Sequence, residues 1–491
     1  MKSLQVLLIL GCLILGGYSA NLLRTDAGLK LRDSVSAISI DTFLNNSGLS
    51  DTLQAEGCFN SEFLRIGSKR LLAQCYENFY APKADLLPGC IIYDTSNDTL
   101  AEVSRLNTAD NRGRSNAFPS PNPALRYVAS SLYRPLNLSL RGAQAAFSPN
   151  VFSIELHRYD ASGHLEASPA IDLNMQTLNP LFYWYSISYN GLCGVSDDGK
   201  ILLSTYLTVL QTQVYTLLKV NDNITSLTPL VTVEASPTEK AGYNSFCQTA
   251  RLWRDKKDAN IYHAIIPENS WNLLNPVGVT AQLSYWILDT ASNTFVRQAT
   301  DWLPRYIQGL HVDINKGRVY SISTKATPEG EPSSMQVPRA PYNNSAIDKA
   351  YNLRVWEVDT KKHTLNYKGG INTESDGYQV RASADGSLLA VTDSPLLVAT
   401  IAYTVNNPLS DIAYNYAPNT VSVYSVSGNA NLRLQLESAA SASITSFCLS
   451  FDGNDRLAVG GTSTYQRLAS ALGGYDETGQ KNVQLYSIDA N

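Results

Sequence analysis

Few residues in this chain have types and spacing that suggest catalysis or metal binding. No two of its histidines stand at the spacing of a metal-ligand pair. The adjacent acids Asp197 and Asp198 belong to a turn sequence and do not form an acid–base pair. No G-x-S-x-G elbow, phosphate loop or dinucleotide fingerprint occurs. We therefore predict no catalytic residue, no metal ion and no cofactor. The histidines are His157, His164, His263, His311 and His363.

A repeated pair of an aromatic residue and an amide is a better candidate for a functional site. The pair recurs at four corresponding positions, with arginine, glutamine or histidine close by. Aromatic faces beside amide groups suit a polar small molecule, a sugar or a peptide. The same residues also suit a structural ring that caps strand ends, and the sequence leaves both interpretations open. The candidate ligand site comprises Tyr189, Asn190, Tyr243, Asn244, Gln248, Arg305, Tyr306, Gln308, His311, Tyr378, Gln379 and Arg381.

The elements that must position these residues follow from a strand pattern that recurs seven times. Each copy is rich in aromatic and β-branched residues and ends in Asp, Asn or Ser before a polar turn, which is typical of a hairpin. Successive copies are separated by 61 to 70 residues. The copies end at Asp94, Asp160, Asn221, Asp289, Asp359, Ser427 and Asp489.

A second motif alternates with the first and places an Asp-Gly turn between two strands. It is clearest at 196–203, 383–391 and 450–459, and looser versions occur at 66–72, 254–262 and 313–320. Asp accepts hydrogen bonds from the following backbone, and Gly adopts the positive φ that such a turn requires. Each period therefore contains two hairpins, which together predict a four-stranded antiparallel sheet.

Seven such sheets predict an all-β fold, a seven-bladed β-propeller with four-stranded antiparallel blades that occupies residues 21–491 as a single domain. The last copy lacks a fourth strand after it. We expect Val35–Asp41 to supply that strand by pairing with residues 483–489, so that strands near the two ends of the chain close the ring.

The Ser-x-Asp-Gly-x-x-Leu-x-Val turn with the Val-Tyr-x-Val-Asp type of strand is similar to those of YVTN-type and WD-repeat-like propellers. The resemblance extends over nearly all of residues 50–491, although the Gly-His and Trp-Asp dipeptides of true WD repeats are missing. It implies the fold and carries no activity, because propellers perform many unrelated functions.

The first twenty residues predict a secretory signal peptide. Lys2 gives a positive start, an apolar run extends from Leu4 to Gly17, and small residues follow at Ser19 and Ala20. The run is too short for a membrane anchor, so we expect no membrane span. The predicted location is secreted and extracellular. Five Asn-x-Ser/Thr sequences, all in predicted loops or turns, are candidate glycosylation sites, at Asn45, Asn97, Asn137, Asn223 and Asn343.

Removal of the signal leaves six cysteines, and an even number in a secreted chain favours disulfides. The predicted positions of the strands suggest Cys58–Cys448 across the closure, Cys75–Cys90 within the first blade and Cys193–Cys247 between the third and fourth. Buried free thiols are the alternative, because cysteine packs well as a small apolar residue.

Composition limits the classes of partner. A net charge of −5 without a basic block argues against nucleic acid. Three long segments near residues 324–352, 393–419 and 461–481 are rich in Pro, Tyr, Asn, Ala and Ser, which suits either a partner surface or simple elaboration of one face.

We therefore predict a secreted propeller glycoprotein that acts as a binding, structural or assembly module. Its partner would be an extracellular protein or carbohydrate, and the tyrosine-rich loops would allow assembly with itself or with another chain. The alternative is a propeller enzyme of the lactonase or lyase type with its site at the channel mouth. That activity would draw on Glu62, His311 and Asp313.

Overall fold

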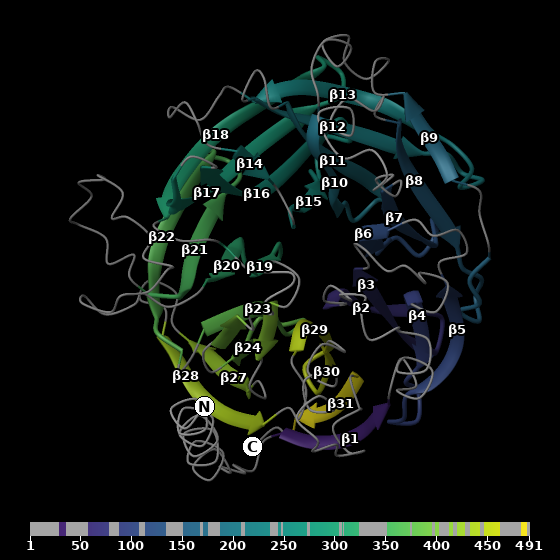
Figure 1. Cartoon of the computed structure of the whole chain (residues 1–491), viewed down its shortest axis with the longest axis vertical. Coiled ribbons are helices and arrows are strands. Elements are labelled where there is room, and N and C mark those ends of the chain that lie inside the picture. Colours follow the sequence, from purple (N-terminus) through teal and green to yellow (C-terminus); the bar gives the residue numbers. More distant parts are fainter. Residues whose placement is uncertain are drawn as a thin grey trace.

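Seven antiparallel sheets form a ring in the computed structural model of the chain (Figure 1). The structure describes residues 29–35, 57–77, 88–107, 113–133, 151–166, 170–174, 187–207, 212–235, 244–246, 249–272, 275–303, 307, 309–323, 351–373, 376–394, 398–401, 412–415, 420–427, 433–441, 446–461 and 483–488. All regular elements in this part of the chain are strands. The predicted all-β, seven-bladed fold is confirmed.

Each blade runs outward from the centre of the ring in strand order, as Figure 1 shows. Blade one contains β2 (Gly57–Ile66), β3 (Lys69–Glu77), β4 (Pro88–Asp94) and β5 (Ala101–Asn107); blade two contains β6 (Gly113–Pro119), β7 (Tyr127–Tyr133), β8 (Val151–Arg158) and β9 (Ala170–Asn174); blade three contains β10 (Ile187–Val195), β11 (Lys200–Leu207), β12 (Thr212–Val220) and β13 (Leu227–Ala235). The inner position of blade four is divided between β14 (Asn244–Phe246) and β15 (Arg251–Arg254), which both pair with β16 (Ile261–Asn272); β17 (Asn275–Asp289) and β18 (Thr294–Leu303) follow.

The remaining blades keep the same order. Blade five contains β19 (Gly309–Asp313), β20 (Arg318–Ile322), β21 (Leu353–Asp359) and β22 (Thr364–Ile371); blade six contains β23 (Asp376–Ala382), β24 (Leu388–Ser394), β27 (Thr420–Ser427) and β28 (Arg433–Ser441). Blade seven contains β29 (Ser446–Asp452), β30 (Arg456–Gly461), β31 (Val483–Ile488) and β1 (Leu29–Val35). A separate hairpin, β25 (Val398–Ile401) with β26 (Ile412–Asn415), lies between β24 and β27 in the chain.

All seven copies of the predicted strand pattern form the third strand of a blade. The acid that ends such a strand starts the following turn. The side chains of Asp94, Asp160, Asp289 and Asp359 each accept a hydrogen bond from the amide two residues later, at 2.7–2.9 Å. Hydrogen bonds within each turn lower the pKa of each of the four carboxyls, led by those from the Ser96 side chain, the His164 amide, the Ser292 side chain and the Lys362 amide. The recurrent acid is thus explained by turn formation rather than by a shared site.

The chain closes the ring by pairing its N-terminal part with its C-terminal part, as predicted, but with an earlier segment. The strand that pairs with β31 is β1, residues 29–35, in a register that joins Leu31 to Tyr486 and Val35 to Val483. Only Val35 of the predicted 35–41 segment takes part, and residues 36–41 lie outside the described residues. An outer strand has a sheet neighbour on one side only, so it tolerates the charged residues of β1, such as the exposed Arg32.

The core consists of apolar clusters sandwiched between neighbouring blades. One cluster joins blades two and three through Tyr127, Leu156, Leu192 and Leu203. Another joins blades four and five and includes Trp356, whose indole is fully buried and donates to Asp301 at 2.9 Å. Because each sheet packs against both neighbours, the blades hold one another in a rigid ring.

The two faces of the ring differ. In antiparallel blades, the turns between first and second strands and between third and fourth strands share one face, which we call the turn face. The connections between second and third strands, and those between blades, begin and end at the opposite face, the connection face. The three long segments predicted from composition join β20 to β21, β24 to β27 and β30 to β31, so their ends lie on the connection face of three adjacent blades.

Candidate functional site

The predicted ligand residues that the structure describes lie on inner strands. Tyr189 and Asn190 belong to β10, Asn244 begins β14, and Tyr378 and Gln379 belong to β23. They lie toward the strand ends that meet the connection face. The other predicted residues from this ring, Tyr243, Gln248, Arg305, Tyr306 and Gln308, lie outside the described residues.

Two further predicted residues, His311 of β19 and Arg381 of β23, come together with Arg251 of β15, which the sequence did not single out. These strands are the inner strands of three consecutive blades (Figure 1). Arg381 Nη1 donates to the carbonyl of Leu310 at 3.0 Å and to that of Val380 at 2.9 Å, and it contacts Gln379 Oε1 at 3.3 Å. The bond to Leu310 ties blade six to blade five directly beside His311.

The electrostatic field in this cluster is positive. Burial, Arg381 and Arg251 together lower the pKa of His311 well below its usual value, so the imidazole is neutral at physiological pH. Burial lowers the pKa of Arg381 to about 10, Glu62 of β2 opposes that shift, and Arg251 adds to it. The guanidinium of Arg381 therefore remains charged at neutral pH. His311, Arg251, Arg381 and Glu62 are all part-exposed, so solvent reaches them within the ring.

Of the three residues suggested for an enzymatic alternative, Glu62 and His311 both lie near Arg381, and Asp313 takes part in a turn. Asp313 is at the end of β19, where Oδ1 accepts hydrogen bonds from the amides of Asn315 and Lys316 at 3.1 Å. Among the described residues, the charges that act on His311 are those of Arg381 and Arg251. In the described part of the chain, no group of three His, Cys, Asp or Glu residues is arranged to hold a metal ion.

A second histidine centre lies inside blade four and is structural. His263 Nε2 is 3.0 Å from Asp255 Oδ2, and its Nδ1 is 2.7 Å from the hydroxyl of Tyr285. A carboxylate only accepts, so Nε2 is the donor to Asp255. Trp253 and Tyr285 stack on the imidazole with ring centroids at 5.5 and 5.9 Å. His263 and Tyr285 are fully buried, which leaves no room for a substrate.

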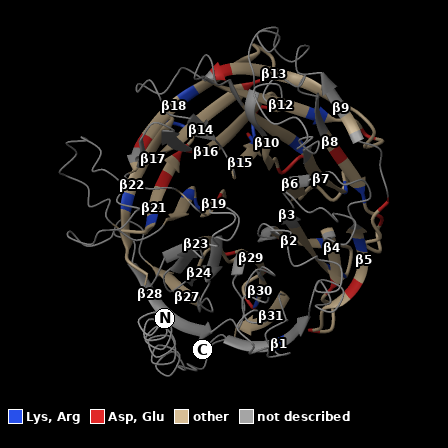
Figure 2. Ribbon diagram, in the orientation of Figure 1, with Lys and Arg blue, Asp and Glu red and all other residues tan. Residues whose placement is uncertain are grey.

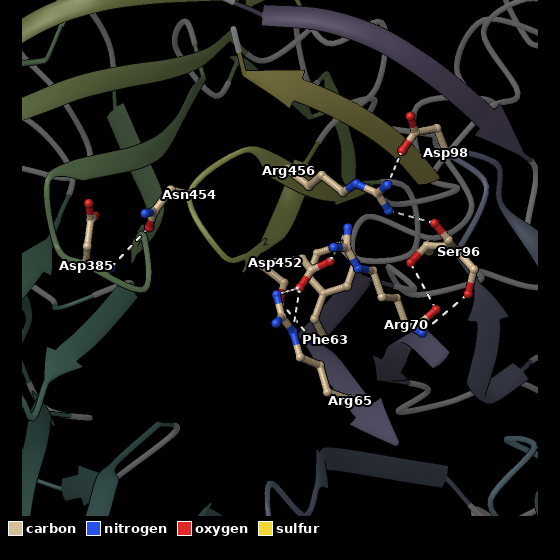
Figure 3. A network of polar contacts seen from close by, with 11 residues as sticks. Phe63, Arg65, Arg70, Ser96, Asp98, Asp385, Asp452, Asn454 and Arg456 are labelled. Carbon is tan, nitrogen blue, oxygen red and sulfur yellow. Dashed lines mark hydrogen bonds and ion pairs between the residues drawn. The ribbon is translucent and has the colours of Figure 1, made fainter. Parts of the chain in front are cut away.

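A polar network joins blade seven to blade one on the turn face, and Figure 3 shows it. The buried Asp452 accepts from Arg65 at 2.6 Å, and Arg70 lies 3.6 Å from its other oxygen. Arg456 contacts Asp98 and donates to the carbonyl of Thr95. On the other side of blade seven, Asn454 accepts from the amide of Asp385 at 3.1 Å. The residues of these turns thus bond to one another across three blades.

The cysteine arrangement differs in part from the prediction. Cys75 and Cys90 face each other across β3 and β4 with their sulfurs 3.6 Å apart, and both are buried thiols. The contact with Cys90 and burial raise the pKa of Cys75 well above its usual value. Cys193 also carries a thiol rather than a disulfide. The predicted Cys75–Cys90 and Cys193–Cys247 bridges are therefore not formed in this structure, where all three sulfurs pack as small apolar groups.

The Cys58–Cys448 bridge stays a prediction, because the side chain of Cys58 lies outside the described residues. The two cysteines are in β2 and β29, the inner strands of neighbouring blades, and each stands at a β-bulge. Of the five candidate glycosylation sites, Asn97 and Asn223 are described. Both are exposed in the turn between third and fourth strands. Asn45, Asn137 and Asn343 lie outside the described residues.

Charged residues occur in many places around the ring, with acidic and basic positions interspersed (Figure 2). No single-sign stripe of the kind that binds nucleic acid is visible on the described strands in this view. No helix in the described part of the chain has the length and apolar character needed to cross a membrane.

No protein-family model matches the chain, and no curated protein has a similar sequence. Solved structures with a similar chain path include a protein from Lactobacillus plantarum, which shares 11% identity over 86% of this chain and 98% of its own, with a TM-score of 0.45. The β-propeller domain of Cps50 (Swd1) from Myceliophteria thermophila shares 10% identity over 90% of this chain and 100% of its own, with a TM-score of 0.43. The Pan2 WD40 domain of Neurospora crassa shares 8% identity over 94% and 96%, with a TM-score of 0.41. The blades described above themselves establish that this chain is a seven-bladed β-propeller.

Proposed function

We propose that this protein is a secreted propeller glycoprotein that binds an extracellular partner through its connection face. The observation that carries the proposal is the grouping of the three long segments. They join second to third strands in blades five, six and seven, so their ends lie together on one face of a rigid ring. Long connections on a rigid scaffold are a common site of recognition.

The turn face is less suited to a partner. Its turns are short, and several of their polar groups are used by neighbouring blades. Asp197 accepts from the amide of Arg254 at 3.0 Å, and Asp198 accepts from the hydroxyl of Tyr262 at 2.8 Å. The exposed Asn97 and Asn223 are on the same face, where attached glycans would keep another protein away.

Secretion and glycosylation are tested by expressing the full chain in a eukaryotic secretory cell. We expect the chain in the medium with a new N-terminus after residue 19 or 20. An amidase that removes N-linked glycans should increase its mobility. N97Q and N223Q should each remove one increment of mass from the untreated protein. Retention inside the cell with an intact N-terminus would contradict the proposed compartment.

The binding face is tested with a photo-crosslinking amino acid at one of two positions. Tyr414 is in β26, within the connection between β24 and β27, and His363 is exposed in the turn between β21 and β22. In the extracellular fluid of the native source, we expect one defined adduct from position 414 and none from position 363. An adduct from 363 alone, or no adduct from either, would contradict binding through the connection face.

A further inference from the structure

The cluster formed by Arg251, His311 and Arg381 has hydrogen-bonding capacity that the described residues do not use. Arg251 is part-exposed, and its buried Nε has no acceptor among them. No described carboxylate forms an ion pair with Arg251 or Arg381, whereas several other arginines of the blades pair with one, namely Arg65, Arg70, Arg105, Arg297 and Arg456. An arginine offers five N–H donors, so this is a large unused capacity.

The contacts that fix the position of Arg381 use only one of its three guanidinium nitrogens. All its described hydrogen bonds are made by Nη1, to Leu310, Val380 and Gln379. No described residue accepts from Nε or Nη2. Because Nη1 is anchored to the backbone of two adjacent inner strands, the guanidinium has a defined orientation before any ligand arrives. A preorganised guanidinium loses less entropy when it binds an oxyanion.

The balance of charge limits which oxyanion fits. Arg251 and Arg381 contribute two positive charges, His311 is neutral, and Glu62 is the acid that acts on Arg381 from the inner strand of blade one. The net charge of this group is therefore about +1. A carboxylate carries one negative charge and matches the geometry of the guanidinium donors. Phosphate near pH 7 carries nearly two negative charges, so its complex with this group would have an excess of negative charge.

We propose that the inner edge of blades four to six is a binding site for the carboxylate of a ligand, such as an acidic sugar or a peptide carboxylate, held between Arg251 and Arg381 beside His311. The site does not depend on the partner proposed for the connection face. It is an extension of the polar ligand site predicted from Gln379, Arg381 and His311, with Arg251 added and the chemistry of the ligand specified.

The test is calorimetric titration of the full mature chain with sodium acetate, sodium glucuronate, sodium sulfate and sodium phosphate at constant ionic strength and pH 7. We expect both carboxylates to bind. R251Q and R381Q should each raise the dissociation constant at least tenfold, because each removes a charged hydrogen-bond donor. The matched control is R158Q, since Arg158 is exposed on the third strand of blade two, and it should leave the constant unchanged.

A variant outside the proposed contacts guards against misfolding of the arginine variants. E62Q removes the competing acid, so it should tighten carboxylate binding several-fold, a gain that a damaged protein would not show. The proposal is overturned if neither carboxylate binds at 50 mM (about the weakest affinity such a site would have), if R158Q weakens binding as much as R251Q, or if E62Q leaves it unchanged. Phosphate or sulfate binding more than tenfold tighter than acetate would overturn the assignment to carboxylates.

Discussion

Substitution of Asp255 by Asn should destabilise blade four, and the loss should depend on pH. The carboxylate accepts from His263 Nε2 at 3.0 Å and from the amides of Lys257 and Asp258 at 2.7 and 3.0 Å. The hydrogen bond from His263, which contributes most, lowers the pKa of Asp255 from 3.8 to about 2. Asn retains an oxygen for the two amides but loses the charge that faces His263.

The expected magnitude follows from linkage between the pKa and folding. The lowering of the Asp255 pKa from 3.8 to about 2 corresponds to at most about 2.5 kcal/mol of folding free energy. The side chain is 28% exposed, and solvent screens its interactions, so we expect about 1–1.5 kcal/mol. Because the pKa is lower in the folded state, this stability is fully present above about pH 4 and disappears as the pH falls toward 2.

Urea denaturation from pH 7 to pH 2.5, followed by tryptophan fluorescence, measures the effect, since Trp253 stacks on His263. The free energy of unfolding of D255N should lie below that of the wild type at pH 7, and the two should converge at low pH. In an H263Q background, D255N should cost about 1 kcal/mol less. D258N is the control in the same turn, because the one hydrogen bond described for the Asp258 side chain comes from the amide of Asn260. A D255N difference that stays constant with pH, or is unchanged in the H263Q background, would refute the reasoning.

Three further predictions concern stability and closure. D452A removes the buried acid that Arg65 and Arg70 share at the junction of blades seven and one, and it should lower the free energy of unfolding by about 1.5–3 kcal/mol in the same urea assay; an effect below about 0.5 kcal/mol would show that the junction does not depend on this pair. H363G should raise the unfolding free energy by about 0.5–1 kcal/mol, because exposed His363 has a φ of 56°, which glycine adopts without strain; calorimetry should show a higher melting temperature, and a lower one would contradict the strain argument. Peptide mapping of the non-reduced secreted chain should recover a disulfide-linked Cys58–Cys448 peptide and unbridged Cys75, Cys90 and Cys193. Recovery of Cys58 as an alkylated thiol would show that the bridge across the closure is not formed.

The repeat was visible in the sequence because turn chemistry is local. Such a turn needs an Asp that accepts from the following amides and a Gly with positive φ. The same two residue types therefore recur in several blades, as at Asp385 and Gly386, where the φ of the glycine is 63°. The first turn of blade two was missed because it uses other residues for the same purpose. There the side chain of Asn122 accepts from the amide of Ala124 at 2.9 Å, within a Ser-Pro-Asn-Pro sequence that contains no Asp-Gly.

The candidate site was only partly predictable, because it depends on packing between blades. His311 and Arg381 were identified from their positions after an aromatic–amide pair, but Arg251 stands in a strand of four residues with no motif of its own. Its proximity to His311 follows from the position of β15 beside β19, which no local pattern encodes. The closing strand was predicted at residues 35–41 but is β1, residues 29–35. As an outer strand, β1 has one sheet neighbour and therefore only a weak alternation of apolar residues, so the sequence did not mark it.

The closure also has a consequence for the order of events during synthesis. β1 is made before any other blade strand, yet its partner β31 is the last, as the bond from Arg32 to Ser487 across 455 positions illustrates. At roughly 5–20 residues per second, β1 waits on the order of 20–90 seconds with its hydrogen-bonding edge unpaired. During that interval six blades can assemble, but the ring remains an open arc with two uncovered blade surfaces. The nascent protein is therefore most exposed to chaperones and to mispairing just before its final segment leaves the ribosome.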